Sequence, residues 1–109
     1  MSNILKELDE ILEARKLQDP SESYVASLYD KGLEKILKKI AEESVETVMA
    51  AKDIEHNGDK AHLIYEVADL WFHTMVLLAS QGLSSEDVTT ELQRRFGMSG
   101  HEEKANRTK

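Results

Sequence analysis

The chain has 109 residues, of which 40% are hydrophobic and 32% are charged, and its formal net charge is −7 at pH 7. This size fits a single domain, and the acidic balance argues against nucleic-acid binding, which needs Lys and Arg to neutralise phosphates. The absence of cysteine excludes disulfides, thiolate zinc sites and thiol catalysis. We find no secretory signal and no stretch that we expect to span a membrane, so we predict a cytoplasmic protein without a membrane or nucleic-acid partner.

The apolar spacing predicts helices throughout, because no segment alternates polar and apolar residues as a strand would. The predicted helices cover about residues 4–16, 23–55, 60–81 and 84–96. Pro20 lies in the first break, and Gly32 is expected to interrupt the second helix, which makes four or five helices. Short connections favour antiparallel neighbours. The sequence therefore predicts a compact, all-α antiparallel bundle at residues 1–96, followed by a polar tail at residues 97–109.

Local signals mark the helix ends. Asp59 is a plausible N-cap for the helix at 60–81, and Gly82 has the position of a residue that ends it in a left-handed conformation. Ser84 and Asp87 have the three-residue spacing of a capping box. These signals predict that the two longest helices form a hairpin and that a shorter helix follows it.

The predicted helix at 60–81 is unusual, because apolar residues occupy roughly 240° of its helical wheel. Its narrow polar stripe consists of His62, Glu66, Asp69 and His73. A helix that is apolar most of the way round is normally buried, so Glu66 and Asp69 are expected to emerge beside a core. Removing a carboxylate from water costs several kcal/mol unless it is paired or bound to a metal.

The preceding helix supplies a matching pair of acids, Glu43 at the edge of its apolar stripe and Glu46 beside it. An antiparallel hairpin places Glu43 opposite Asp69, and Glu46 opposite Glu66. Helices pack about 8–10 Å apart, so the four carboxylates converge. A hard divalent cation would relieve their repulsion, and an all-oxygen site selects Mg²⁺ or Mn²⁺. The alternative is a surface acid cluster relaxed by water and Lys39.

The acids stand as Glu42-Glu43-x-x-Glu46, then nineteen residues, then Glu66-x-x-Asp69. This arrangement resembles the signature of the all-α nucleoside triphosphate pyrophosphohydrolases, the MazG-like superfamily. Within it, the chain is similar to the phosphoribosyl-ATP pyrophosphatase family over nearly its whole length. The stretches that carry this similarity are residues 20–32, 38–51, 66–83 and 97–105. The sequence shows no fused cyclohydrolase domain, so the resemblance is to the stand-alone form.

The resemblance implies Mg²⁺-dependent hydrolysis of phosphoribosyl-ATP to phosphoribosyl-AMP and pyrophosphate, the second step of histidine biosynthesis. By motif position it implies that the metal ligands are Glu43, Glu46, Glu66 and Asp69. Glu42 joins Glu43 and Glu46 as a catalytic residue, either orienting water or helping a second metal.

Three residues near these acids have two readings each. Lys39 either contacts a phosphate or forms an i,i+4 pair with Glu43. Tyr24 either stacks on the substrate or packs between helices. His73 either orients Asp69, four residues before it, or closes the edge of a buried helix.

The wide apolar surface of the helix at 60–81 also predicts a homodimer or a higher even oligomer, because so short a chain cannot cover it. A second subunit then adds residues to the cleft. Two alternatives to the histidine-pathway reaction stay open: a general (d)NTP pyrophosphohydrolase that cleans the nucleotide pool, and a non-catalytic helical dimer.

Overall fold

The computed structural model describes residues 3–97, and within this range the ordered elements are all helical. They are α1 (Ile4–Ala14), the 3-10 turn η1 (Arg15–Leu17), α2 (Tyr24–Lys31), α3 (Leu33–Ile54), α4 (Lys60–Ser80) and α5 (Ser85–Phe96). The prediction of an all-α fold with four to five helices is confirmed. The predicted tail lies outside the described residues apart from Gly97.

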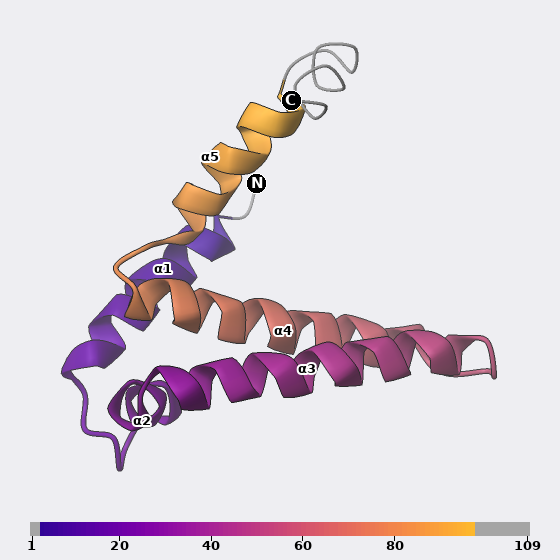
Figure 1. Cartoon of the computed structure of the whole chain (residues 1–109), viewed down its shortest axis with the longest axis horizontal. Coiled ribbons are helices and arrows are strands. Elements are labelled where there is room, and N and C mark those ends of the chain that lie inside the picture. Colours follow the sequence, from indigo (N-terminus) through magenta and orange to yellow (C-terminus); the bar gives the residue numbers. More distant parts are fainter. Residues whose placement is uncertain (1–2, 98–109) are drawn as a thin grey trace.

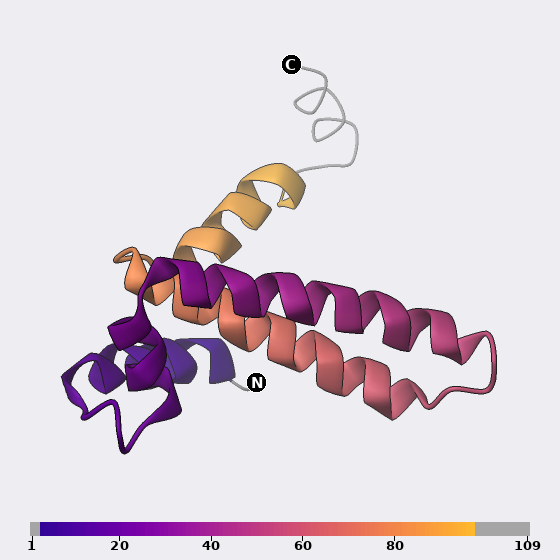
Figure 2. The same cartoon turned by 60° about the horizontal axis from the view of Figure 1, so that its bottom comes forward.

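The centre of the fold is a long antiparallel hairpin of α3 and α4, which lie side by side along most of their length (Figures 1 and 2). The tight turn between them contains Asn57, whose φ is 69°, and Gly58, whose N–H donates to the carbonyl of Asp53 at 2.7 Å. Helices α1 and α2 pack at the opposite end of the hairpin, and α5 extends away from it (Figure 1).

The predicted helix boundaries have the expected local chemistry. The Asp59 carboxylate accepts from the Ala61 N–H at 2.8 Å, and Ser84 and Asp87 form the capping box. Gly82 ends α4 with φ 74°, and the next N–H, from Leu83, donates back to the carbonyl of Leu78 at 2.8 Å. This is the Schellman arrangement, which satisfies the last carbonyls of the helix.

Gly32 divides the long helical pattern into α2 and α3, as predicted. Its φ of 95° and ψ of −180° lie in a region that only glycine occupies without strain. The side chain of Ser23 caps the start of α2 by accepting from the Ala26 N–H at 3.1 Å. Together these two residues set where α2 begins and the direction in which α3 leaves it.

The core lies at the end of the hairpin where the first four helices meet. Its fully buried side chains are Leu12, Leu28, Ile36 and Val76. The Tyr29 hydroxyl ties α2 to α1 by donating to the carbonyl of Leu12 at 2.9 Å. The carboxylate of Asp9 on α1 accepts from the Ser85 N–H at 3.0 Å, which attaches the start of α5 to α1.

The length and composition of α4 bear on the expectation that no stretch spans a membrane. This helix has 21 residues and is long and apolar enough, by length and composition, to cross a membrane. Because the core helix of a soluble protein has the same properties, this is weak evidence for a span. Instead, α4 packs along α3 and buries the polar side chains of Glu66 and His73.

A single chain covers only one side of α4. Within the described residues, large apolar side chains along the hairpin remain exposed: Val45, Val48, Met49, Ile64, Tyr65 and Trp71. The radius of gyration is 16.7 Å, whereas a compact domain of 100 residues has about 13 Å. The chain is therefore elongated, with an uncovered apolar surface.

Candidate metal centre

Four acidic side chains meet between α3 and α4, at the position that the hairpin predicts. One ligand oxygen from each of Glu43, Glu46 and Glu66 lies within 4.8 Å of the others. Ligand atoms of Glu43, Asp69 and His73 form a second such group. Glu43 belongs to both groups, so the two acids of α3 and the two of α4 form one continuous cluster, which we call the carboxylate cluster.

Burial distinguishes the members of the carboxylate cluster. The exposed fractions of Glu43 and Glu66 are only 4% and 6%, whereas Asp69 is half-buried and Glu46 is exposed. One oxygen of Glu43 and one of Glu66, Oε2 in both, are buried without a hydrogen-bond partner in residues 3–97. Such a group normally costs stability. Oxygens of this kind fit a hard cation such as Mg²⁺, which prefers carboxylate ligands.

The electrostatics favour a bound cation as well. Burial, as the largest cause, and the neighbouring carboxylates of Glu46 and Asp69 together raise the pKa of Glu43 to about 7. Burial also raises the pKa of Glu66, with Glu46 as the next cause. Like charges held this close disfavour ionisation, and a divalent cation reverses that effect.

His73 is buried beside the carboxylate cluster, but its contacts exclude it as a ligand through Nδ1. That nitrogen lies 3.0 Å from the backbone oxygen of Asp69 and 3.5 Å from Oε1 of Glu43. Because a carbonyl oxygen only accepts, Nδ1 carries the proton and has no lone pair for a metal. The sequence suggested a link to the Asp69 side chain; the structure shows contacts with the Asp69 backbone and with Glu43.

Tyr24 joins the site from α2, in a way that sequence reasoning missed. Its hydroxyl lies 2.8 Å from Nε2 of His73, and its ring stacks on Phe72 with the centroids 6.5 Å apart. About half of the Tyr24 side chain remains exposed. The sequence named Tyr24 as a residue that stacks on the substrate or packs between helices, but it gave no sign of a contact with His73 on α4.

Lys39 and Glu42 lie at the rim of the carboxylate cluster. The Lys39 ammonium is 3.6 Å from the Glu42 carboxylate, so the ion pair forms with Glu42 rather than with Glu43. Glu42 is exposed and belongs to neither ligand group within the described residues. The pKa of Lys39 is raised, with the nearby Tyr24 phenol as the largest cause.

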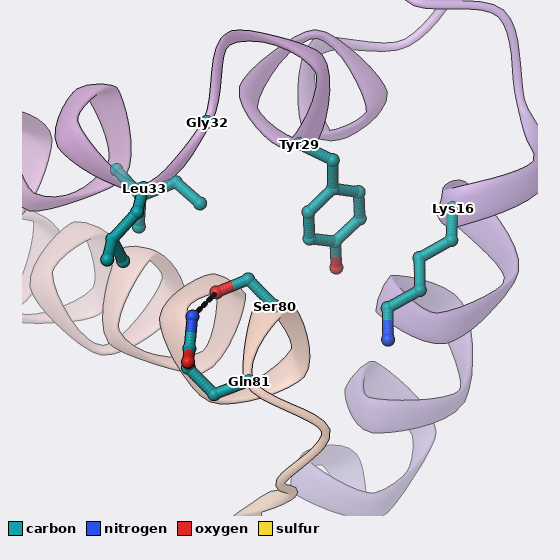
Figure 3. Close-up of a pocket in the computed structure, with 7 residues that line it drawn as sticks. Lys16, Tyr29, Gly32, Leu33, Ser80 and Gln81 are labelled. Carbon is teal, nitrogen blue, oxygen red and sulfur yellow. Dashed lines mark hydrogen bonds between the residues drawn. The ribbon is translucent and has the colours of Figure 1, made fainter.

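A separate pocket of about 390 Å³ lies where α2 meets α3, near the end of α4 (Figure 3). Its lining residues are Lys16, Tyr29, Gly32, Leu33, Ile36, Ser80 and Gln81. The lining contains no carboxylate, so this pocket has none of the ligands that the carboxylate cluster offers.

Comparisons with known proteins agree with this geometry. Residues 5–96 match the family model described as phosphoribosyl-ATP pyrophosphohydrolase. The chain is also 68% identical, over 110 residues, to a protein of Hydrogenovibrio crunogenus named phosphoribosyl-ATP pyrophosphatase. That alignment covers 100% of this chain and 97% of the relative. The chain therefore belongs to the phosphoribosyl-ATP pyrophosphohydrolase family.

Proposed function

We propose that this protein hydrolyses phosphoribosyl-ATP to phosphoribosyl-AMP and pyrophosphate, the second step of histidine biosynthesis, in the cytoplasm and with Mg²⁺ or Mn²⁺ as cofactor. Family membership supports the reaction. The observation that carries the metal requirement is the carboxylate cluster, in which Glu43 and Glu66 each bury an oxygen without a hydrogen-bond partner in the described chain.

The proposed ligands of the cation are Glu43, Glu46, Glu66 and Asp69. When bound, Mg²⁺ offsets the charge of phosphate oxygens and stabilises the departing pyrophosphate. Glu43 and Glu66 would hold the cation with buried carboxylates, whereas Glu46 is exposed to solvent and would leave that side open to the substrate. Glu42 lies outside both ligand groups, so we assign it the positioning of the attacking water.

Two rim residues are proposed to contact the substrate. Lys39 carries a positive charge beside the acidic cluster, where a substrate phosphate arrives. Tyr24 exposes half of its side chain at the same rim, and its aromatic face suits a nucleobase. Both side chains are outside the ligand groups of the carboxylate cluster, so neither competes for the cation.

We propose that the protein works as a homodimer or a higher even oligomer. Residues of α1, α4 and α5 line an apolar groove of about 440 Å³, and Trp71, Leu70 and Val88 are among them. The exposed apolar side chains of the hairpin need a partner surface of this kind. A second copy of the chain can cover both the groove and the exposed side chains, because in a symmetric dimer each surface of one copy contacts the other copy.

Pyrophosphate release by the purified protein with Mg²⁺ tests the reaction, with phosphoribosyl-ATP compared with ATP and a panel of dNTPs. We expect a strong preference for phosphoribosyl-ATP that EDTA abolishes. Preference for dNTPs would instead indicate a nucleotide-pool enzyme with the same metal site. No pyrophosphate release from any of these substrates would contradict the enzymatic function and favour a non-catalytic helical oligomer.

A further inference from the structure

Three side chains from three helices form a continuous polar chain into the carboxylate cluster. The Tyr24 hydroxyl on α2 contacts Nε2 of His73 on α4, and Nδ1 of the same ring faces Oε1 of Glu43 on α3. The exposed fractions of His73 and Glu43 are both only 4%, so water does not replace these contacts easily. The function proposed above uses Glu43 as a metal ligand but gives His73 no role.

The direction of each hydrogen bond follows from what its atoms can do. The backbone oxygen of Asp69 lies 3.0 Å from Nδ1 of His73 and can only accept, so Nδ1 carries a proton. In a neutral imidazole the other nitrogen then has a lone pair. Nε2 therefore accepts from the Tyr24 hydroxyl, and Nδ1–H donates to the backbone oxygen of Asp69. Oε1 of Glu43 lies 3.5 Å from the same protonated nitrogen, an electrostatic contact longer than a hydrogen bond.

We propose that Tyr24 is a positioning residue: its hydroxyl donates to His73, fixes the ring with its proton on Nδ1, and thereby holds Glu43 in place for a divalent cation. This inference rests on the proposed function of Glu43 as a metal ligand. In the opposite tautomer, the Nδ1 lone pair would face two oxygens, and their repulsion would move the Glu43 carboxylate. The Tyr24 bond also polarises the ring, which makes Nδ1–H a stronger donor.

The alternative is that the Tyr24 hydroxyl has only a structural role, which predicts a different effect on metal binding. Its hydroxyl would then only attach α2 to α4, and its loss would lower stability without changing the metal site. Tyr29 offers a matched control, because it lies on the same helix and donates to the carbonyl of Leu12 at 2.9 Å, within the core. Tyr29→Phe removes one hydroxyl bond of the same kind but touches no member of the carboxylate cluster.

The experiment measures Mn²⁺ affinity by calorimetry, without substrate, and the protonated nitrogen of His73 by ¹⁵N NMR. Tyr24→Phe should weaken Mn²⁺ binding about 10–100-fold, the usual effect of losing a residue that orients a metal ligand, and should shift the His73 ring resonances. Tyr29→Phe should change neither. Circular dichroism checks that both variants keep the helical fold.

A double-mutant cycle supplies the sharpest test. In His73→Asn the amide nitrogen can still donate towards Asp69, but Tyr24 has no acceptor. Adding Tyr24→Phe to that variant should weaken Mn²⁺ binding no further, whereas full additivity of the two losses would overturn the proposal. Wild-type affinity in Tyr24→Phe would overturn it too. If the wild-type protein itself binds no Mn²⁺, the proposed metal site fails together with this inference. If the wild-type protein binds Mn²⁺ and Tyr24→Phe binds it equally well, only the inference about Tyr24 fails.

Discussion

Glu43 and Glu66 face each other across the α3–α4 hairpin with carboxylate oxygens within 4.8 Å, and Oε2 of each is buried without a partner among residues 3–97. Two like charges in such a place oppose folding unless something compensates them. A divalent cation does so with the ligands already in position. The carboxylate cluster thus lowers the stability of the metal-free protein, but its ligands are already in position to bind a cation.

The first prediction concerns activity. Glu43→Gln should lower kcat/KM for phosphoribosyl-ATP by at least about 100-fold, because the amide keeps the shape but loses the charge that binds the cation. Pyrophosphate release at saturating Mg²⁺ measures this. Glu10→Gln, which changes an exposed acid of α1, is the control and should retain full activity. Wild-type turnover by the Glu43→Gln variant would show that Glu43 is not needed for the reaction.

The second prediction concerns pH without metal. Burial raises the pKa of Glu43 to about 7, well above its unfolded value of about 4.5, so between these values the folded state binds more protons than the unfolded state. The free energy of unfolding should therefore fall as pH rises from about 5 to about 8, by an amount on the order of 1–3 kcal/mol. Urea denaturation in EDTA measures this dependence.

The control for the pH experiment is Glu43→Gln, which has no proton to lose at this position. Its free energy of unfolding should depend less on pH over the same range. Equal slopes for the variant and the wild-type protein would mean that Glu43 ionises in the folded state as it does in water.

The third prediction concerns the α2–α3 junction. Gly32→Ala should lower the free energy of unfolding by about 1–3 kcal/mol, since its φ of 95° and ψ of −180° suit only glycine. A methyl group there would meet no atom within 4 Å, so the cost is backbone strain alone. Gly32→Asn should be equally harmful, although asparagine tolerates ordinary left-handed positions. Urea denaturation measures both variants. A decrease in the free energy of unfolding below about 0.5 kcal/mol, the size of a neutral surface substitution, would contradict the prediction.

The fourth prediction concerns assembly. Trp71→Glu places a charge in the apolar groove beside α5 and should shift the protein from dimer to monomer in analytical ultracentrifugation. Leu17→Glu is the matched control, because Leu17 is 93% exposed in η1 and lies outside that groove. It should leave the mass unchanged. A wild-type protein that sediments as a monomer at micromolar concentration would exclude the proposed dimer.

The pairing of Glu43 with Asp69 and of Glu46 with Glu66 was predictable from the sequence. Helical periodicity sets which residues share a face, and a five-residue turn leaves little freedom in how the two helices meet. The helix caps followed from local chemistry in the same way. None of these features depends on a contact between distant segments other than the hairpin itself.

The contact between Tyr24 and His73 could not be predicted, because it depends on the direction in which α2 leaves Gly32 and on packing against α4. The choice of Glu42 over Glu43 as the partner of Lys39 was also open, since both lie within reach on a helix. Burial of Glu43 inside the hairpin decides it.

Calorimetric titration of the metal-free protein with Mg²⁺, without substrate, tests the central claim most directly. We expect saturable binding to the wild-type protein and its loss in Glu66→Gln, whose only change is one buried carboxylate oxygen. Mg²⁺ at 100 times its dissociation constant should also add about 2.7 kcal/mol to the free energy of unfolding. Equal binding by Glu66→Gln and the wild-type protein, or binding by neither, would contradict the assignment of the carboxylate cluster as the metal centre.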